Sequence, residues 1–206
     1  MNAPLLYTIG HSNHELSGLI DLVQRHQVAV IADVRSSPYS RFTPQFNRES
    51  LIAALRNQGM DYLFLGKELG ARRIEQECYC DQKVKFNLVA QLPSFREGLA
   101  RLRSAARAAP VALLCAEKDP LTCHRTILVC RHLRKENLAI RHILEDGSLE
   151  RHEDAENRLL AMMKLPPGDL FQSKDELVEE AYDRQGDRIA FVDSGALPVE
   201  AMEHVL

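Results

Sequence analysis

The chain has 206 residues, of which 45% are hydrophobic, enough to bury the core of one domain of common size plus an extension. No apolar run approaches the ~18 residues of a membrane-spanning helix, and the opening residues, MNAPLLYTIG, lack the basic and apolar regions of a signal peptide. Five cysteines, an odd number, argue against a secreted disulfide framework. We therefore expect a cytoplasmic protein with no membrane partner.

The net charge of −3 conceals a division of the chain. Residues 1–143 contain 20 Lys and Arg against 13 Asp and Glu, a net of +7, whereas residues 144–206 contain 6 against 16, a net of −10. A basic body can attract anions, and an acidic extension can screen it or compete with them. The same charges could also be ordinary solvated surface, and the sequence leaves both interpretations open.

In chain order, the hydrophobic pattern predicts strands that alternate with helices. Short apolar runs predict five strands, at residues 5–9, 28–34, 61–65, 111–116 and 139–144. Amphipathic segments predict helices at residues 15–26, 49–57, 93–108, 123–135 and 153–164. The alternation predicts a single Rossmann-like three-layer α/β domain over residues 1–150, with a mostly parallel sheet of about five strands.

Three stretches fall outside this alternation. Residues 72–85 are polar and read as an exposed excursion that carries Cys78 and Cys80. Residues 151–206 are assigned to an acidic C-terminal extension, and its part beyond residue 164, after the break at Pro166-Pro167-Gly168, is expected to add little to the core. Within it, residues 177–182 suggest a helix and residues 189–192 a short strand or docking segment.

The chemistry-bearing residues cluster in one stretch, 111–136. A strand is followed by a polar loop, and Thr122 is a plausible N-cap for a helix whose first turn holds Cys123, His124 and Arg125. The free N–H groups and positive dipole end of a helix favour an anion. The same surroundings favour the ionised form of a thiol.

Polar side chains also follow the other predicted strands. In open α/β sheets ligands bind outside the carboxyl ends of the strands. We therefore predict one cleft lined by residues from four strand ends: His11, Asp33, Arg35, Lys67, Glu117 and Arg125.

Cys123 is the candidate nucleophile, with His11 and Glu117 as further catalytic candidates. Cys123 could instead be a small residue that packs the first helical turn. Candidate ligand-binding residues, chosen for anion contacts or for their place at a strand end, are Ser12, Asp33, Arg35, Arg41, Lys67, Lys118, His124 and Arg125. The basic members could instead form ion pairs with Asp33, Glu68 and Glu117.

The cysteine spacing predicts no metal site. Cys78 and Cys80 are closer together than zinc ligands usually are. Cys115 and Cys123 could supply a second pair, but Cys115 closes a buried strand, which makes that geometry doubtful. Cys130 is expected in the core, and no cofactor is expected because neither a dinucleotide fingerprint nor a Walker loop occurs.

Four motifs carry a resemblance to a known family. TIGHS at residues 8–12, DVRSSPYSR at 33–41, LGKELG at 65–70 and LLCAEKDPLTCHR at 113–125 resemble the domain of unknown function DUF488, over roughly residues 5–145. This resemblance implies an α/β fold and an intracellular bacterial or archaeal protein. It brings no reaction with it.

The residues favour an enzyme-like domain that binds a phosphate-bearing or other anionic small molecule, such as a nucleotide, at the strand ends. The alternative is a non-catalytic nucleic-acid-binding or adaptor module. The +7 body makes nucleic acid a possible partner. The absence of tryptophan, an aromatic content of 6% and the lack of a zinc-finger or helix-turn-helix pattern argue against it.

Overall fold

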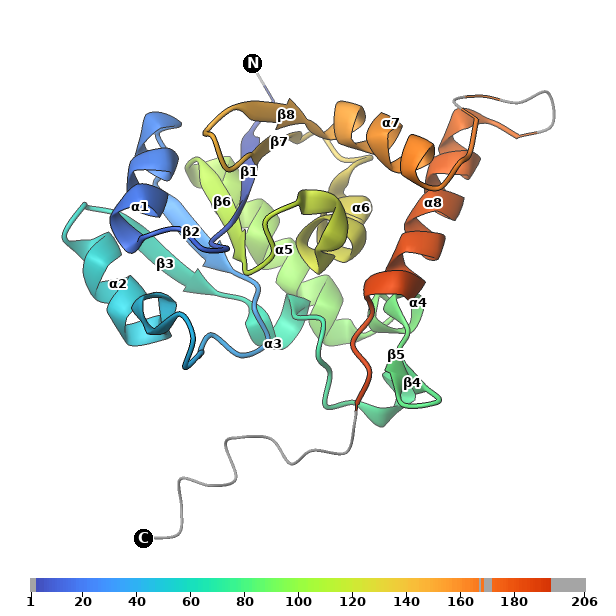
Figure 1. Ribbon diagram of the computed structural model, residues 1–206, viewed down its shortest axis with the longest axis horizontal. Coiled ribbons are helices and arrows are strands. Elements are labelled where there is room, and N and C mark those ends of the chain that lie inside the picture. Colours follow the sequence, from blue (N-terminus) through green and yellow to red (C-terminus); the bar gives the residue numbers. More distant parts are fainter. Residues whose placement is uncertain (1–2, 167, 169–171, 194–206) are drawn as a thin grey trace, which may run out of the picture.

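The computed structural model describes residues 3–166, 168 and 172–193. Its centre is a six-stranded sheet with strand order β3-β2-β6-β1-β7-β8 (Figure 1). Neighbouring strands are parallel except for the antiparallel pair β7–β8. The strands are β1 (Leu5–Gly10), β2 (Val30–Asp33), β3 (Asp61–Phe64), β6 (Val111–Cys115), β7 (Ala139–Ile143) and β8 (Leu149–Arg151). The predicted α/β fold with a mostly parallel sheet is confirmed, with β8 as an additional edge strand.

Helices cover both faces of the sheet and make three layers. Successive residues of a strand point to opposite faces, so Leu6 and Tyr7 of β1 enter two different buried clusters. One cluster packs the sheet against α1 (Leu16–Arg25) and α2 (Arg48–Arg56). The other packs it against α5 (Pro93–Ala108), α6 (Arg131–Leu133), α7 (His152–Met162) and α8 (Lys174–Ile189).

The helix after β6 begins differently from the prediction. Thr122 is not its N-cap: it lies in a short 3-10 turn, η3 (Pro120–Thr122), which the Asp119 side chain caps through Leu121 N. The Cys123 carbonyl then accepts from the backbone N–H groups of Thr126 and Ile127, so the helix starts at Cys123. Its first part, η4 (Arg125–Cys130), is π-helical, a form that is rare and frequent at functional sites.

The excursion before α5 is more ordered than the sequence suggested. Its elements are η2 (Gln76–Cys78) and a small hairpin of β4 (Tyr79–Cys80) and β5 (Lys83–Val84). Cys78 is fully buried, so its expected exposure is wrong, whereas Cys80 is exposed. The other short elements are η1 (Pro44–Phe46), α3 (Gly66–Leu69) and α4 (Phe86–Val89).

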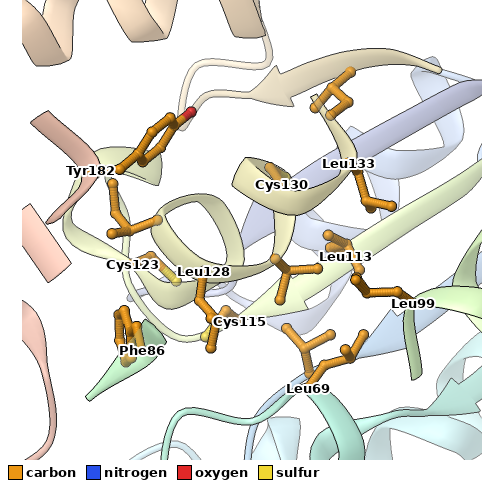
Figure 2. Packing of buried hydrophobic residues seen from close by; sticks show 14 of the residues in the cluster. Leu69, Phe86, Leu99, Leu113, Cys115, Cys123, Leu128, Cys130, Leu133 and Tyr182 are labelled. Atoms are coloured by element: carbon orange, nitrogen blue, oxygen red, sulfur yellow. The ribbon is translucent and has the colours of Figure 1, made fainter. Parts of the chain in front are cut away.

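The expectation that the chain beyond residue 164 adds little to the core is wrong for its described part. Leu177, Val178, Ala181 and Tyr182 of α8 are buried in the same cluster as the sheet. Figure 2 shows Tyr182 among the residues of this cluster. The Phe191 carbonyl accepts from Val84 N–H at 2.9 Å, and this contact docks the end of the described chain on β5. Residues 167, 169–171 and 194–206, which belong to the predicted extension, lie outside the described residues.

Acidic residues of α8 pair with basic residues of the helix after β6. Arg131 contacts Glu179 at 2.8 Å and Asp183 at 2.7 Å, and Arg134 contacts Asp175 at 2.5 Å. These ion pairs leave the side chains of Arg131 and Arg134 only 15% and 11% exposed. Among the described residues, no helix is long and apolar enough to cross a membrane.

Candidate functional site: a thiol cluster at the carboxyl edge of the sheet

The carboxyl ends of β3, β2, β6 and β1 meet at one edge because these four strands are parallel. Backbone hydrogen bonds extend the pairing past the strands: His11 N–H donates to the Cys115 carbonyl, and Ser12 N–H to the Ala116 carbonyl, both at 2.8 Å. A Cβ on Gly10 would lie 1.8 Å from the Glu117 carbonyl oxygen. Glycine at this position therefore lets the turn after β6 lie directly against the end of β1.

Four side chains from this turn and the following helix converge on one point. Cys115 Sγ and Cys123 Sγ each donate to Glu117 Oε2, at 3.0 and 2.9 Å. Cys115 Sγ also lies 3.5 Å from His124 Nδ1. Figure 2 shows the two cysteines near each other within the apolar cluster, close to Leu128. Glu117 is the exposed member of the group, while the two thiols and the imidazole are buried.

Arg125 holds the turn that carries this group. Its fully buried guanidinium donates to the carbonyls of Glu117 at 2.6 Å and Lys118 at 3.1 Å, and its Nε to Thr8 Oγ1 at 3.4 Å. These donors contact the protein itself, so the geometry gives Arg125 a positioning role. Its backbone N–H points to Cys123 Sγ at 3.4 Å.

The surroundings shift the pKa values of the two thiols in opposite directions. Burial opposes ionisation of Cys123, but the hydrogen bond from Cys115 and the nearby positive charges of Arg125 and His124 outweigh it, so its pKa is lowered well below that of a free thiol. Burial and the neighbouring Cys123 raise the pKa of Cys115. Although the residue is exposed, its carboxyl lies against the two buried thiols, and this desolvation together with Cys123 raises the pKa of Glu117.

A hydrogen bond to the backbone fixes the orientation of the His124 ring. Its Nε2 lies 3.0 Å from the Val34 carbonyl, which can only accept, so Nε2 carries a proton. Nδ1 therefore faces the thiols. Although burial lowers the pKa of His124, the hydrogen bond and charge of Cys123 raise it above its usual value overall.

A second polar group lies at the ends of β1 and β2. Fully buried Asp33 accepts from Arg35 Nη2 at 2.6 Å and from the Tyr62 hydroxyl at 2.8 Å, while Arg35 Nη2 also donates to the Phe46 carbonyl. The His11 ring stacks on Phe46 at 4.5 Å. Burial and the charge of Arg35 lower the pKa of His11 to about 4, so it is neutral at pH 7. Next to it, Ser12 adopts a left-handed backbone with φ of 41°.

The remaining predicted ligand-binding residues lie at the outer rim of the carboxyl edge or away from it. Lys67 is in α3, whose first residue Gly66 packs against the Arg35 carbonyl. Lys118 is exposed and forms an ion pair with Glu145. Arg41 lies over the ring of exposed Phe42.

Two hollows of the described surface lie elsewhere. One, of about 430 Å³, lies between α4, β5 and α8, and the other, of about 230 Å³, lies beside α2 and β3.

Cys115 is the functional candidate that the sequence reasoning set aside. It was assigned to the core because it closes a buried strand, and it is buried. Because it is also the last residue of β6, its side chain reaches the polar edge. The signal that could have found it is its position at a strand end that is followed directly by Glu117.

This architecture defines an α/β protein with a cysteine- and histidine-containing centre at the carboxyl edge of a parallel sheet. The family model of DUF488, a domain of unknown function, matches residues 15–131, more than half of the chain, so the chain belongs to this family. The matched range contains three of the four motifs, and TIGHS precedes it. No curated protein and no solved structure matches the chain.

Proposed function

We propose that the protein is an enzyme-like domain that binds a phosphate-bearing or other anionic small molecule at the carboxyl edge and uses Cys123 as nucleophile. The observation that carries the proposal is the setting of Cys123 Sγ. It lies 2.9 Å from Glu117 Oε2 and 3.4 Å from the Arg125 backbone N–H, beside the imidazole of His124. A thiol with a proton acceptor on one side and positive groups on the other is typical of an activated cysteine.

The contacts support a specific order of proton and electron movements. Cys123 passes its proton to Glu117, and the thiolate donates an electron pair to an electrophilic atom of the ligand. The bond from that atom to the leaving group breaks, and the leaving group keeps the bonding pair and takes the proton from Glu117. Water then attacks the same atom, the bond to sulfur breaks with its electron pair returning to Cys123, and His11, neutral at pH 7, takes the proton that the water loses.

The local charges favour an anionic ligand over a cationic one. Asp33 offsets the charge of Arg35, while the positive charge of Arg125 and the raised pKa of His124 counter the negative charge of the Cys123 thiolate. Lys67 adds positive charge near the rim, whereas Glu145 offsets the charge of Lys118. Glu117 is exposed, so a ligand would approach the thiols from its side.

The experiment compares two alkylating reagents, anionic iodoacetate and neutral iodoacetamide, on chelator-treated protein, with labelled sites identified by peptide mapping. Exposed Cys80 is the reference thiol within the same chain. We expect the labelling rate of Cys123 relative to Cys80 to be roughly tenfold or more higher with iodoacetate, the lower end of electrostatic rate enhancement, and inorganic phosphate to reduce it. If Cys80 labels first with both reagents and Cys123 reacts only after unfolding, Cys123 is a packing residue and the proposal fails.

The nucleic-acid or adaptor alternative predicts a different result. The pairing of Arg131, Arg134 and Lys135 with α8 removes part of the positive surface that it requires. Binding to random oligonucleotides that falls steeply with salt would favour this alternative. Binding of a small nucleotide without such binding to oligonucleotides would favour the enzyme.

A further inference from the structure

We propose that Cys115, Glu117, Cys123 and His124 form a binding site for one divalent transition-metal ion, with Zn²⁺ as the best fit. One ligand atom from each residue can be chosen so that all four lie within 4.8 Å of one another. The inference goes beyond the proposed function and reverses the expectation drawn from cysteine spacing. That expectation rested on Cys115 pointing into the core, whereas its sulfur faces the other three groups.

The separations come close to those of a tetrahedral site, with no two of the four ligand atoms more than 4.8 Å apart. Bond lengths of ~2.0–2.3 Å in a tetrahedral zinc site place the ligand atoms ~3.3–3.8 Å apart. The sulfur–oxygen distances here are 2.9 and 3.0 Å, and the sulfur–nitrogen distance from Cys115 to His124 is 3.5 Å. The hydrogen-bonded groups therefore need to open by less than about an ångström to admit the ion.

The surrounding protein orients the ligands as metal sites require. A metal-bound histidine usually donates its second ring N–H to a carbonyl or carboxylate. His124 does so through Nε2 to Val34, which leaves Nδ1 for the ion. The Arg125 backbone N–H points to Cys123 Sγ, and its guanidinium fixes the turn that carries Glu117. Cys115 ends a central strand, and Cys123 and His124 lie at the start of the following helix. These three ligands therefore stand on or next to regular secondary structure.

The donor set selects the class of ion. Two thiolates and an imidazole favour zinc and related soft or borderline metals over Mg²⁺ and Ca²⁺, which prefer oxygen ligands. Two thiolates and one carboxylate would leave the loaded site with one net negative charge. The guanidinium of Arg125 lies close enough to interact with both sulfurs and can balance that charge.

Metal binding and the nucleophilic role of Cys123 exclude each other, because both use the same sulfur. The loaded protein should therefore resist alkylation at Cys115 and Cys123, whereas Cys80 should react as before. Metal-free protein is the form to which the proposed function applies.

The test titrates chelator-treated full-length protein with Co²⁺, whose absorption reports thiolate ligands and tetrahedral geometry, and then displaces it with Zn²⁺. We expect one ion per chain. Cys115→Ser and Cys123→Ser should each weaken binding by more than the roughly 10–100-fold that loss of an outer-shell partner costs. Glu117→Gln lies at an exposed position, so this variant should stay folded, and it should bind the metal ion more weakly than the parent protein does. Cys80→Ser is the matched control and should leave the affinity unchanged.

Two results would overturn the site. One is the absence of a thiolate–cobalt absorption. The other is binding that survives Cys115→Ser and Cys123→Ser but is lost with Cys80→Ser. The alkylation experiment separates this outcome from failure of the proposed function. Metal binding without preferential labelling of Cys123 in the metal-free protein supports the site alone. Preferential labelling without metal binding supports the nucleophile alone.

Discussion

The carboxyl edge and the C-terminal layer of α7 and α8 both concentrate polar side chains, but they satisfy them in opposite ways. In the C-terminal layer opposite charges form a network of ion pairs: Arg131 pairs with Glu179 and Asp183, and Arg134 with Asp175 and Glu179. At the edge, two thiols donate to the same oxygen of Glu117. The first arrangement is complete as it stands, whereas the second brings several ligating atoms to one point.

This difference distinguishes a structural cluster from a functional one. Complementary pairs neutralise each other and join two helices, as Glu156 and Arg134 do between α7 and α6. Ligating side chains with strongly shifted pKa values that meet at one point are typical of functional sites, where they can take an added ion or a reacting atom. Four substitutions or conditions test whether the two regions differ in this way, and they are ordered from the largest expected effect to the smallest.

Asp33→Asn should have the largest effect, because the carboxyl edge also contains one structural pair. Asp33 is fully buried and accepts from Arg35 and Tyr62, so the substitution leaves the buried guanidinium without its counter-charge. We expect the free energy of unfolding, measured in urea, to fall by about 3–5 kcal/mol. Glu68→Gln, which breaks a more exposed pair with Arg101, is the control and should cost about 0–1 kcal/mol. Equal small losses would contradict a structural role for Asp33.

Tyr182→Phe should have an intermediate effect in the C-terminal layer. The buried Tyr182 hydroxyl lies 3.1 Å from both His152 Nε2 and Glu156 Oε1, and Phe leaves these buried groups without that partner. We expect a loss of about 1–3 kcal/mol in the urea-unfolding free energy. Tyr39→Phe, at an exposed tyrosine, is the matched control and should stay within about 0.5 kcal/mol. A Tyr182→Phe protein as stable as the parent would show that the layer is held by apolar packing alone.

Most of the fold could be predicted from the sequence because it depends on local patterns. The alternation of apolar runs and amphipathic segments predicted five strands, and α5 occupies the predicted residues 93–108. The core contribution of α8 was missed because its four buried apolar residues lie among acidic ones, and only tertiary pairing with Arg131 and Arg134 makes that face compatible with burial. Strand β8 was missed because it has three residues, too few for a periodic signal.

The candidate site was only partly predictable. The strand-end rule singled out Glu117, Cys123 and His124, which the structure brings together. Sequence could not show that the donors of Arg125 would contact backbone carbonyls, because that depends on the path of the turn after β6. Nor could it show on which side of its strand end the Cys115 sulfur would lie. Both features depend on how the chain is arranged in three dimensions, which the residue types alone do not determine.

Lowering the pH should destabilise the protein through two histidines of the C-terminal layer and its neighbouring strand. Burial, with nearby positive charge, lowers the pKa of His142 well below its usual value, and burial lowers that of His152. Below the unfolded pKa of about 6.5, the unfolded chain therefore binds more protons than the folded one, and stability falls as pH falls.

Each histidine contributes at most ~1.4 kcal/mol per pH unit in this window. The measurement is the urea-unfolding free energy at pH 7.5 and 5.5 for the parent and for His152→Gln. The variant should show a shallower dependence because one of the groups with a lowered pKa is gone. An unchanged slope would place the acid sensitivity outside the His142–His152 pair.

Glu117→Gln in metal-free protein should have the smallest effect on stability and is the sharpest test of the comparison. The position is exposed, and the amide oxygen of Gln can still accept from one of the two thiols. We expect the free energy of unfolding to stay within about 0.5 kcal/mol of the parent, as for surface substitutions generally. The same substitution removes an anionic ligand and a proton acceptor, so metal affinity and Cys123 labelling should both fall. A loss of stability above about 2 kcal/mol, with metal affinity unchanged, would make Glu117 a structural partner of the thiols, and the carboxyl edge would then resemble the C-terminal layer.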